Sequence, residues 1–338
     1  MKSVKNKQWR LGVPRALLYY YYGPWWEAFF QALGVETVVS PPTGREIMDR
    51  GVGLAVAEAC LPVKVYYGHA AWLAPRVDVL FVPRLVSVEH KAFICPKLMG
   101  LPDMLRAAIK DCPPVLAPTV DLARRPDEGL QAAIRAIARA LDVRVGEAAA
   151  AGETAGARYR EWLARQREAG AWLGNGPPGG CPAGRSPSPG EGQAARGAVP
   201  LTVGVIGHSY LLYDRYLGLD IPNKIARLGG RVVLPENLAP EAGERACHQL
   251  PKRLYWTLGR KIMGTALYLM EQASIDGLIH LTAFGCGPDS LVGDLAERYA
   301  HRRSKPFLLL TLDEHTGEAG LNTRLEAFMD MLKRRRTA

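Results

Sequence analysis

The chain has 338 residues, 48% of them hydrophobic, so it is long enough to form two domains with cores of their own. Its formal net charge is +10 at pH 7, but lysine and arginine are spread along the chain and concentrate only in residues 2–10 and 333–336. We interpret this charge as solvated surface that also suits a phosphate-bearing ligand, and we expect no binding to nucleic acid.

The termini and the apolar runs bear on cellular location. No apolar run is long enough to span a bilayer, and the basic N-terminus leads into the sequence LGVP at residues 11–14 rather than into a signal-peptide core. Six cysteines in so long a chain do not suggest a disulfide scaffold. We therefore expect a cytoplasmic protein without a membrane partner, whose cysteines are metal ligands, catalytic groups or inert.

Apolar runs alternate with helix-like segments in the first half of the chain, which is typical of a parallel sheet. The predicted elements are a strand and loop (9–15), a helix (27–33) that stops at Gly34, a strand (35–40), a helix ending at residue 50, a buried strand (77–82) and an amphipathic helix (127–141). The aromatic run at residues 19–26 is assigned to packing, with the lining of a ligand pocket as the alternative. Ligands of such folds gather beyond the carboxyl ends of the strands.

A change of composition separates the two halves. Residues 174–197 are dominated by Gly, Pro, Ser and Ala and are predicted to form a flexible linker. Beyond it we predict strands at 200–207, 231–234, 277–281 and 305–311, and helices at 213–228, 258–274 and 318–332. The expected fold class is α/β, with two doubly wound, flavodoxin- or Rossmann-like domains and a cleft between them. The expected boundaries are 1–140, a helix plus linker at 141–199, and 200–338.

Three cysteines share one local pattern, with apolar residues before them and a proline just after. They are Cys60, Cys95 and Cys286, in the sequences EACLP, FICPK and FGCGPD. Proline removes an N–H group and restrains the backbone, and a helix beginning there would favour a thiolate through its free N–H groups and dipole. We expect these cysteines to face one metal centre, with the third approaching the other two across the cleft.

The competing hypothesis is that each cysteine is a small buried hydrophobic residue. The spacing does not contain a CxxC pair or a ferredoxin-like run of cysteines. Cys112 and Cys181 are also followed by proline, and Cys181 lies in the expected linker. We assign Cys112 and Cys247 structural or incidental roles, and we do not expect Cys181 to bind a cluster.

Two histidines follow predicted strands and are the candidate catalytic residues. His208 follows the glycine that ends a strand, and His315 lies in the sequence DEHTGE after the last strand. We expect His208 to donate a hydrogen bond to substrate or to cluster sulfur, and a histidine whose nitrogens are satisfied by the backbone is the alternative. His315 suits acid–base chemistry at the strand end, and the neighbouring carboxylates of Asp313, Glu314 and Glu318 are its alternatives.

Four polar neighbours of the cysteines have simpler interpretations. Lys64 and Lys97 either balance the charge of a cluster or lie on the surface. Asp289 and Ser290 are expected to cap the helix that starts near Pro288.

Several longer motifs have an unusual composition. They are residues 11–15 (LGVPR), 58–64 (EACLPVK), 83–87 (PRLVS), 95–103 (CPKLMGLPD), 204–208 (GVIGH), 284–290 (FGCGPDS) and 313–318 (DEHTGE). In these motifs the chain resembles the activase-related proteins of the 2-hydroxyacyl-CoA dehydratase group, often labelled CoA protein activase. The wider group includes dehydratase subunits, benzoyl-CoA reductase subunits and double-cubane-cluster proteins.

The resemblance implies two flavodoxin-like domains and a cysteine-ligated iron–sulfur centre, 4Fe-4S or a larger related cluster, in their cleft. Cys60, Cys95 and Cys286 match the family's cysteine positions. The resemblance also implies a partner activase, an ATPase of actin-like fold that supplies low-potential electrons, and pairing of subunits into homo- or heterodimers. The chain itself lacks the glycine-rich phosphate loop of such an ATPase, so we expect no ATP hydrolysis.

Two functional classes follow, because fold and cluster recur with different substrates. In the first, the chain is a reductase or dehydratase subunit that acts on an acyl-CoA or another small molecule. In the second, it is a non-catalytic electron-transfer or accessory protein that binds an activase. A third hypothesis is a zinc-binding or metal-free structural protein.

Overall fold

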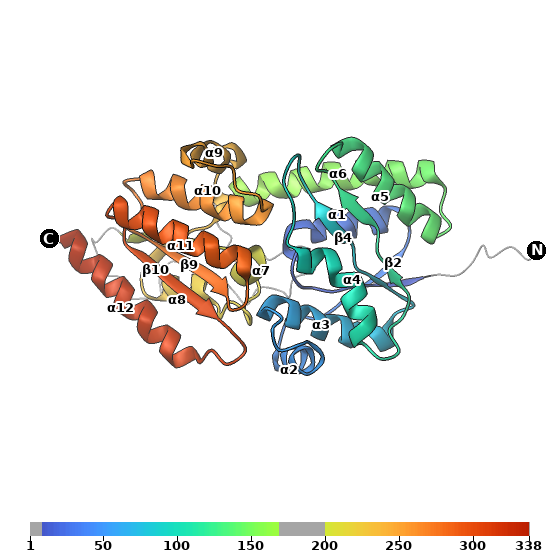
Figure 1. Ribbon diagram of the computed structural model, residues 1–338, viewed down its shortest axis with the longest axis horizontal. Coiled ribbons are helices and arrows are strands. Elements are labelled where there is room, and N and C mark those ends of the chain that lie inside the picture. Colours follow the sequence, from blue (N-terminus) through green and yellow to red (C-terminus); the bar gives the residue numbers. More distant parts are fainter. Residues whose placement is uncertain (1–8, 169–199, 338) are drawn as a thin grey trace, which may run out of the picture. The chain divides into compact units, whose positions relative to one another are not determined.

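The structure is a computed structural model that describes residues 9–168 and 200–337 (Figure 1). These residues form two compact units. The first contains the described residues up to Ala59 together with Val63–Leu163, and the second contains Cys60–Pro62 and the described residues from Ala164 onward. The expected linker at 174–197, with Cys181, lies outside the described residues.

A parallel sheet of four strands forms the centre of the first unit. In spatial order its strands are β2 (Glu36–Val39), β1 (Arg10–Val13), β3 (Val79–Phe81) and β5 (Val115–Leu116). The register pairs Gly12 of β1 with Val38 on one side and Leu80 on the other. The parallel pairing of these strands confirms the predicted α/β architecture. Strands of such a sheet have little polar character because helices cover them.

Helices and a small second sheet complete this unit. They are α1 (Tyr19–Ala32), α2 (Arg45–Leu54), α3 (Leu61–Leu73), the 3₁₀ turn η1 (Ala74–Arg76), α4 (Pro96–Ala108), α5 (Pro126–Ala140), α6 (Val145–Glu168), and the parallel strand pair β4 (Arg84–Ser87) and β6 (Thr119–Asp121). Apolar residues dominate the buried side of α5, which includes Ile134 and Ile137. The strand pair was not predicted.

The first helix is longer than predicted. It begins at Tyr19 rather than at residue 27, and it contains Pro24. Proline inside a helix removes a hydrogen bond, and the burial of aromatic rings offsets that loss. Phe30, for example, is fully buried with its ring 4.9 Å from that of Phe81 on β3. The predicted stop at Gly34 is confirmed. This glycine has φ +68°, a left-handed conformation that residues with a Cβ atom rarely adopt and that commonly ends a helix.

Two glycines let α2 and α3 cross at close range. A Cβ atom on Gly51 of α2 would lie 2.0 Å from the carbonyl oxygen of Lys64, and one on Gly68 of α3 would lie 2.0 Å from that of Ile47. Any side chain at either position would push the helices apart. This contact holds α3, whose first residue directly follows Cys60.

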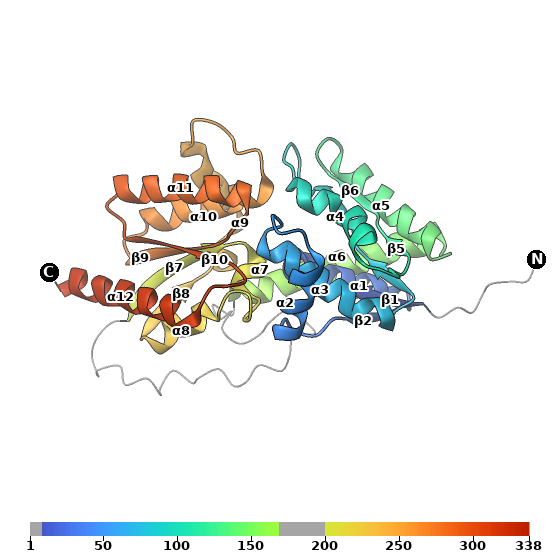
Figure 2. The same ribbon diagram turned by 60° about the horizontal axis from the view of Figure 1, so that its bottom comes forward.

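The second unit has the same arrangement of strands. Its parallel sheet has the order β8 (Gly230–Val233), β7 (Leu201–Gly207), β9 (Gly277–Ala283) and β10 (Phe307–Leu312). In each unit the first strand lies between the second and the third, an order compatible with flavodoxin-like and Rossmann folds. Figure 2 shows β7, β9 and β10 running side by side.

Helices pack on this second sheet. They are α7 (Ser209–Leu212), α8 (Ile221–Arg227), η2 (Pro235–Asn237), α9 (Pro240–Ala246), η3 (Cys247–Gln249), α10 (Thr257–Glu271), α11 (Gly287–Arg302) and α12 (Glu318–Thr337). The core joins Met263 and Leu267 of α10 and Val292 and Ala296 of α11 to Leu278 of β9. None of the helices in the described ranges is both long and apolar enough to cross a membrane.

The predicted helix at 213–228 is wrong in its first half. A short α7 ends at Leu212, and α8 begins only at Ile221. Leu219 and Asp220 both have positive φ, 50° and 52°, and this left-handed pair interrupts any continuous helix. The break leaves His208 at the start of its own short helix.

Candidate metal centre

All three predicted cysteine ligands stand directly before the first residue of a helix. Cys95 is the N-cap of α4, Cys286 is the N-cap of α11, and Cys60 precedes α3. In each helix a proline occupies the first or second position. The free N–H groups and the dipole of a helix N-terminus favour negative charge, so each position suits a thiolate. The helix expected near Pro288 is confirmed, and helices also begin at Pro96 and at Leu61, one residue before Pro62.

The three cysteines differ in burial and in unit. Cys60 and Cys286 are buried and belong to the second unit, whereas Cys95 is half-buried and belongs to the first. Gly285, which precedes Cys286, has φ +77°, and a Cβ atom on it would lie 3.5 Å from the Cα atom of Cys60 in the same unit. A glycine here allows the segment before α11 to approach Cys60.

Cys112 and Cys247 have other settings. Cys112 precedes two prolines and β5 rather than a helix. Cys247 begins η3, and its thiol donates a hydrogen bond to the carbonyl oxygen of Arg260 at 3.4 Å. Burial, together with the nearby Glu244, raises the pKa of the Cys247 thiol to about 11. A thiol that remains protonated and bonded to the backbone suits the structural role predicted for it.

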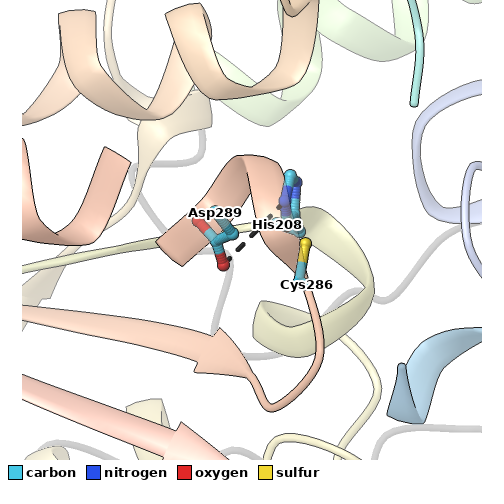
Figure 3. A group of neighbouring side chains, drawn as sticks. All are labelled: His208, Cys286 and Asp289. Atoms are coloured by element: carbon cyan, nitrogen blue, oxygen red, sulfur yellow. Dashed lines mark ion pairs between the residues drawn. The ribbon is translucent and has the colours of Figure 1, made fainter. Parts of the chain in front are cut away.

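A group of potential metal ligands surrounds Cys286. One ligand atom from each of His208, Cys286 and Asp289 lies within 4.8 Å of the others, and all three residues are buried (Figure 3). His208 follows β7, whereas Cys286 and Asp289 belong to the segment after β9 and the start of α11. Because β7 and β9 are parallel neighbours, their carboxyl ends meet at one edge of the sheet.

Gly207 places His208 against β9. Its φ is +154°, and a Cβ atom on it would lie 2.6 Å from the carbonyl oxygen of Leu281. Only glycine therefore fits between the two strands at this point. His208 follows immediately, and its ring stacks on that of Tyr210 at 4.9 Å.

Asp289 is not the helix cap that we predicted. It is fully buried, and its Oδ1 atom lies 3.1 Å from Nε2 of His280, a hydrogen-bonding distance. Its Oδ2 atom lies 3.9 Å from Nε2 of His208. Ser290 is no cap either, since its hydroxyl donates to the carbonyl oxygen of Cys286 at 2.9 Å. Each carboxylate oxygen of Asp289 thus faces a different histidine, because α11 turns this carboxylate toward the sheet rather than toward its own N–H groups.

His280 was not anticipated. It lies in the middle of β9, and its neighbours Ile279 and Leu281 are apolar. The signal in the sequence that could have indicated its role was a titratable residue within an apolar strand, since buried polar groups need partners. Gly293, one turn after Asp289, leaves room for its ring, because a Cβ atom there would lie 3.4 Å from Nδ1 of His280.

The protonation states favour a neutral imidazole beside a carboxylate. Burial lowers the pKa of His208, against an opposite effect from Asp289. Burial alone would raise the pKa of Asp289, but its interactions with His208 and His280, including the hydrogen bond with His280, together hold the pKa below its usual value. Neutral imidazole and ionised carboxylate are the forms that bind metals.

The remaining predicted residues lie elsewhere. His315 is exposed in the turn between β10 and α12, and its backbone N–H donates to Oδ1 of Asp313 at 2.9 Å. The ligand group around Cys286 does not include it. Lys64 is buried, against the surface alternative, whereas Lys97 is partly exposed and its ammonium donates to the carbonyl oxygen of Glu58 at 3.3 Å.

Fold and site define an α/β protein with parallel sheets and a buried group of thiol, imidazole and carboxylate that could bind a metal. Residues 10–238 match a family described as CoA enzyme activase uncharacterised domain, and the chain belongs to this family. The resemblance to activase-related proteins is thereby confirmed. The matched range contains Cys60, Cys95 and His208 and ends before Cys286. No curated protein matches the chain.

Proposed function

We propose that this chain is an iron–sulfur protein that receives electrons in an activase-dependent system, with Cys60, Cys95 and Cys286 as the protein ligands of its cluster. The observation that carries the proposal is that all three cysteines directly precede a helix that has a proline in its first turn. Cys112, also followed by proline, precedes no helix. A helix directly after the cysteine therefore distinguishes the three proposed ligands from Cys112, which shares only the following proline.

The donors suit such a cluster. Thiolates bind iron–sulfur clusters, and a helix N-terminus stabilises both a thiolate and the anionic cluster. The bound cluster would supply one-electron chemistry at low potential. Because Cys95 and Cys286 belong to different units, the doubly wound domains and intervening cleft implied by the resemblance are part of this proposal. Three cysteine ligands of a 4Fe-4S cluster would leave one iron open to a further ligand.

The proposed partner is an ATP-dependent activase, which the family membership favours. In this hypothesis the chain is a cytoplasmic subunit that reduces or dehydrates an acyl-CoA or another small molecule. His208 then acts at the metal centre, and His315 serves in acid–base chemistry from its exposed turn. A homo- or heterodimer would fit this role.

The alternative is a non-catalytic accessory protein that binds an activase and passes electrons onward to another protein. A cavity of about 40 Å³ lies at the carboxyl ends of β1 and β3, with residues such as Val13, Trp26 and Phe81 in its wall. Its lining includes none of the three cysteines, so this particular cavity is not a substrate pocket beside the proposed cluster.

Iron and sulfide analysis tests the cluster. After anaerobic reconstitution, the wild type should bind iron and acid-labile sulfide and show an EPR signal once reduced. Cys60→Ala, Cys95→Ala and Cys286→Ala should each lose most of this iron, whereas the control variants Cys112→Ala and Cys247→Ala should retain it. A wild type without iron, or a triple variant that keeps it, would overturn the proposal.

Turnover separates the two roles. With an ATP-dependent activase and a panel of acyl-CoA thioesters, an enzyme subunit converts at least one compound only when the activase and ATP are present. A chain whose cluster is reduced by the activase, but which converts no compound in the panel, supports the accessory role.

A further inference from the structure

His208 carries a buried nitrogen that the protein does not satisfy. The residue is 4% exposed, and its Nδ1 atom has no hydrogen-bond partner among the residues that the structure describes. Buried polar atoms are nearly always hydrogen-bonded, so an exception of this kind points to a missing partner. Its other ring nitrogen, Nε2, faces Oδ2 of Asp289 at 3.9 Å.

A second buried histidine shows what a purely structural role looks like in this chain. His69 of α3 is fully buried, and both of its nitrogens have partners. Nδ1 lies 2.8 Å from the hydroxyl of Ser40, and Nε2 lies 3.0 Å from that of Thr43. Compared with His69, His208 has one nitrogen without a partner, as does His280, but of these two histidines only His208 belongs to the ligand group that contains the Cys286 thiol.

The spacing suits a shared metal. Ligand atoms of His208, Cys286 and Asp289 lie within 4.8 Å of one another, and metals bind nitrogen and sulfur at about 2.0–2.3 Å. Metal-binding histidines commonly direct their second nitrogen at a carboxylate, which orients the ring. Asp289 occupies that position beside Nε2, and the hydrogen bond with His280 holds the carboxylate in place.

We propose that His208 binds, through Nδ1, the metal centre that Cys286 helps to hold, and that Asp289 and His280 position its ring. The inference rests on the proposed function for the identity of the centre, which would then have mixed sulfur and nitrogen ligands. An imidazole ligand is neutral where a thiolate is charged, and histidine ligands raise the potential of a cluster. His208 would thus tune the potential of the centre as well as hold it.

Pulsed EPR on the reduced, reconstituted protein tests the ligand. With histidine labelled by nitrogen-15, the wild type should show a nitrogen hyperfine coupling that changes with the isotope. His208→Ala should lose this coupling, and the control His301→Gln, on the exposed end of α11, should keep it. His208→Cys should restore iron binding without the coupling and lower the midpoint potential.

The positioning residues have their own readout. Asp289→Asn should weaken iron binding by about 10- to 100-fold, as is usual when a partner of a metal-binding histidine is changed. Asp294→Asn, on the exposed side of α11, is the control and should leave iron binding unchanged. Iron content and potential unchanged in His208→Ala, with no nitrogen coupling in the wild type, would overturn the inference while leaving the cluster intact.

Cobalt separates this inference from the proposed function. If the wild type binds neither iron nor sulfide, the cluster proposal fails, and titration with Co²⁺ alone then tests the ligand group. Visible ligand-field and thiolate charge-transfer bands that disappear in both His208→Ala and Cys286→Ala would support nitrogen and sulfur ligation. Absence of these bands in a wild type shown by circular dichroism to be folded would overturn it.

Discussion

Nε2 of His280 and Oδ1 of Asp289 lie 3.1 Å apart, although one belongs to the middle of β9 and the other to the first turn of α11, and both residues are fully buried. This hydrogen bond connects the first turn of α11, the helix that Cys286 precedes, to the central part of β9 in the sheet. It also holds the carboxylate beside His208. A single contact thus links the stability of the second unit to the geometry of the candidate site.

Removing the carboxylate should destabilise the second unit. Asp289→Ala leaves the buried ring of His280 without its hydrogen-bond partner, and an unsatisfied buried polar group of this kind costs about 1–3 kcal/mol of the free energy of unfolding. The matched control is Asp294→Ala on the same helix, whose exposed pair with Arg298 at 2.9 Å is worth about 0–1 kcal/mol. Urea unfolding followed by circular dichroism measures both. Equal losses in the two variants would contradict the proposed role of the buried pair.

The close crossing of α2 and α3 should tolerate no side chain. Gly51→Ala would bring a Cβ atom to 2.0 Å from the carbonyl oxygen of Lys64, so the helices must separate, at a cost of about 1–3 kcal/mol. Gly53→Ala on the same helix meets nothing within 4 Å and should be neutral or stabilising by up to about 1 kcal/mol. The thermal midpoint of Gly51→Ala should therefore fall below that of the wild type. The midpoint of Gly53→Ala should stay unchanged or rise.

Stability should fall in acid because of His69. Burial, with a smaller effect from Arg15, lowers the pKa of His69 from 6.5 to about 3, so the folded state keeps this ring neutral while the unfolded chain takes up a proton. The contribution of His69 is complete above pH 6.5 and is lost as the pH falls toward 3. The slope is at most about 1.4 kcal/mol per pH unit for one proton.

Denaturant midpoints between about pH 7 and pH 4 measure this slope. His69→Gln should show a shallower dependence on pH than the wild type, and the exposed His315→Gln should not. His208, whose pKa burial also lowers, contributes in the same direction and remains in both variants. An unchanged slope in His69→Gln would show that folding does not lower the pKa of His69.

Thiol labelling should leave Cys247 almost untouched near neutral pH. Burial raises the pKa of this thiol to about 11, and only the thiolate reacts with iodoacetamide. Mass spectrometry of peptides from the metal-free protein should show Cys247 alkylated far more slowly than free cysteine at about pH 7.5, with the rate rising as the pH approaches 11. Rapid labelling at neutral pH would mean that the thiol is exposed or ionised.

The sequence by itself determined the features that depend on neighbours a few residues apart. Short apolar runs separated by helical segments predicted the parallel sheets, because each strand and each covering helix carries its own pattern. Proline directly after Cys95, and two residues after Cys60 and Cys286, marked positions where a helix begins. Such signals act through backbone angles and missing N–H groups, so they need no knowledge of the fold.

Local signals were misleading where packing outweighed them. A helix was predicted only from residue 27, but buried aromatic rings keep α1 continuous from Tyr19 through Pro24. Over residues 213–228 one helix was predicted, whereas Leu219 and Asp220, which have positive φ, precede a helix that begins only at Ile221. In both cases the competing term is a tertiary one that no short window of sequence contains.

Only the tertiary structure decided which polar residues meet. The parallel pairing of β7 with β9 brings the end of one strand beside the helix that follows the other, and so places His208 next to Cys286 and Asp289. From the sequence alone Asp289 was predicted to cap a helix, whereas in the structure its carboxylate pairs with His280. The physical reason is that hydrogen bonds and metal ligation depend on distances of a few ångströms, and those distances are set by strand order rather than by spacing along the chain.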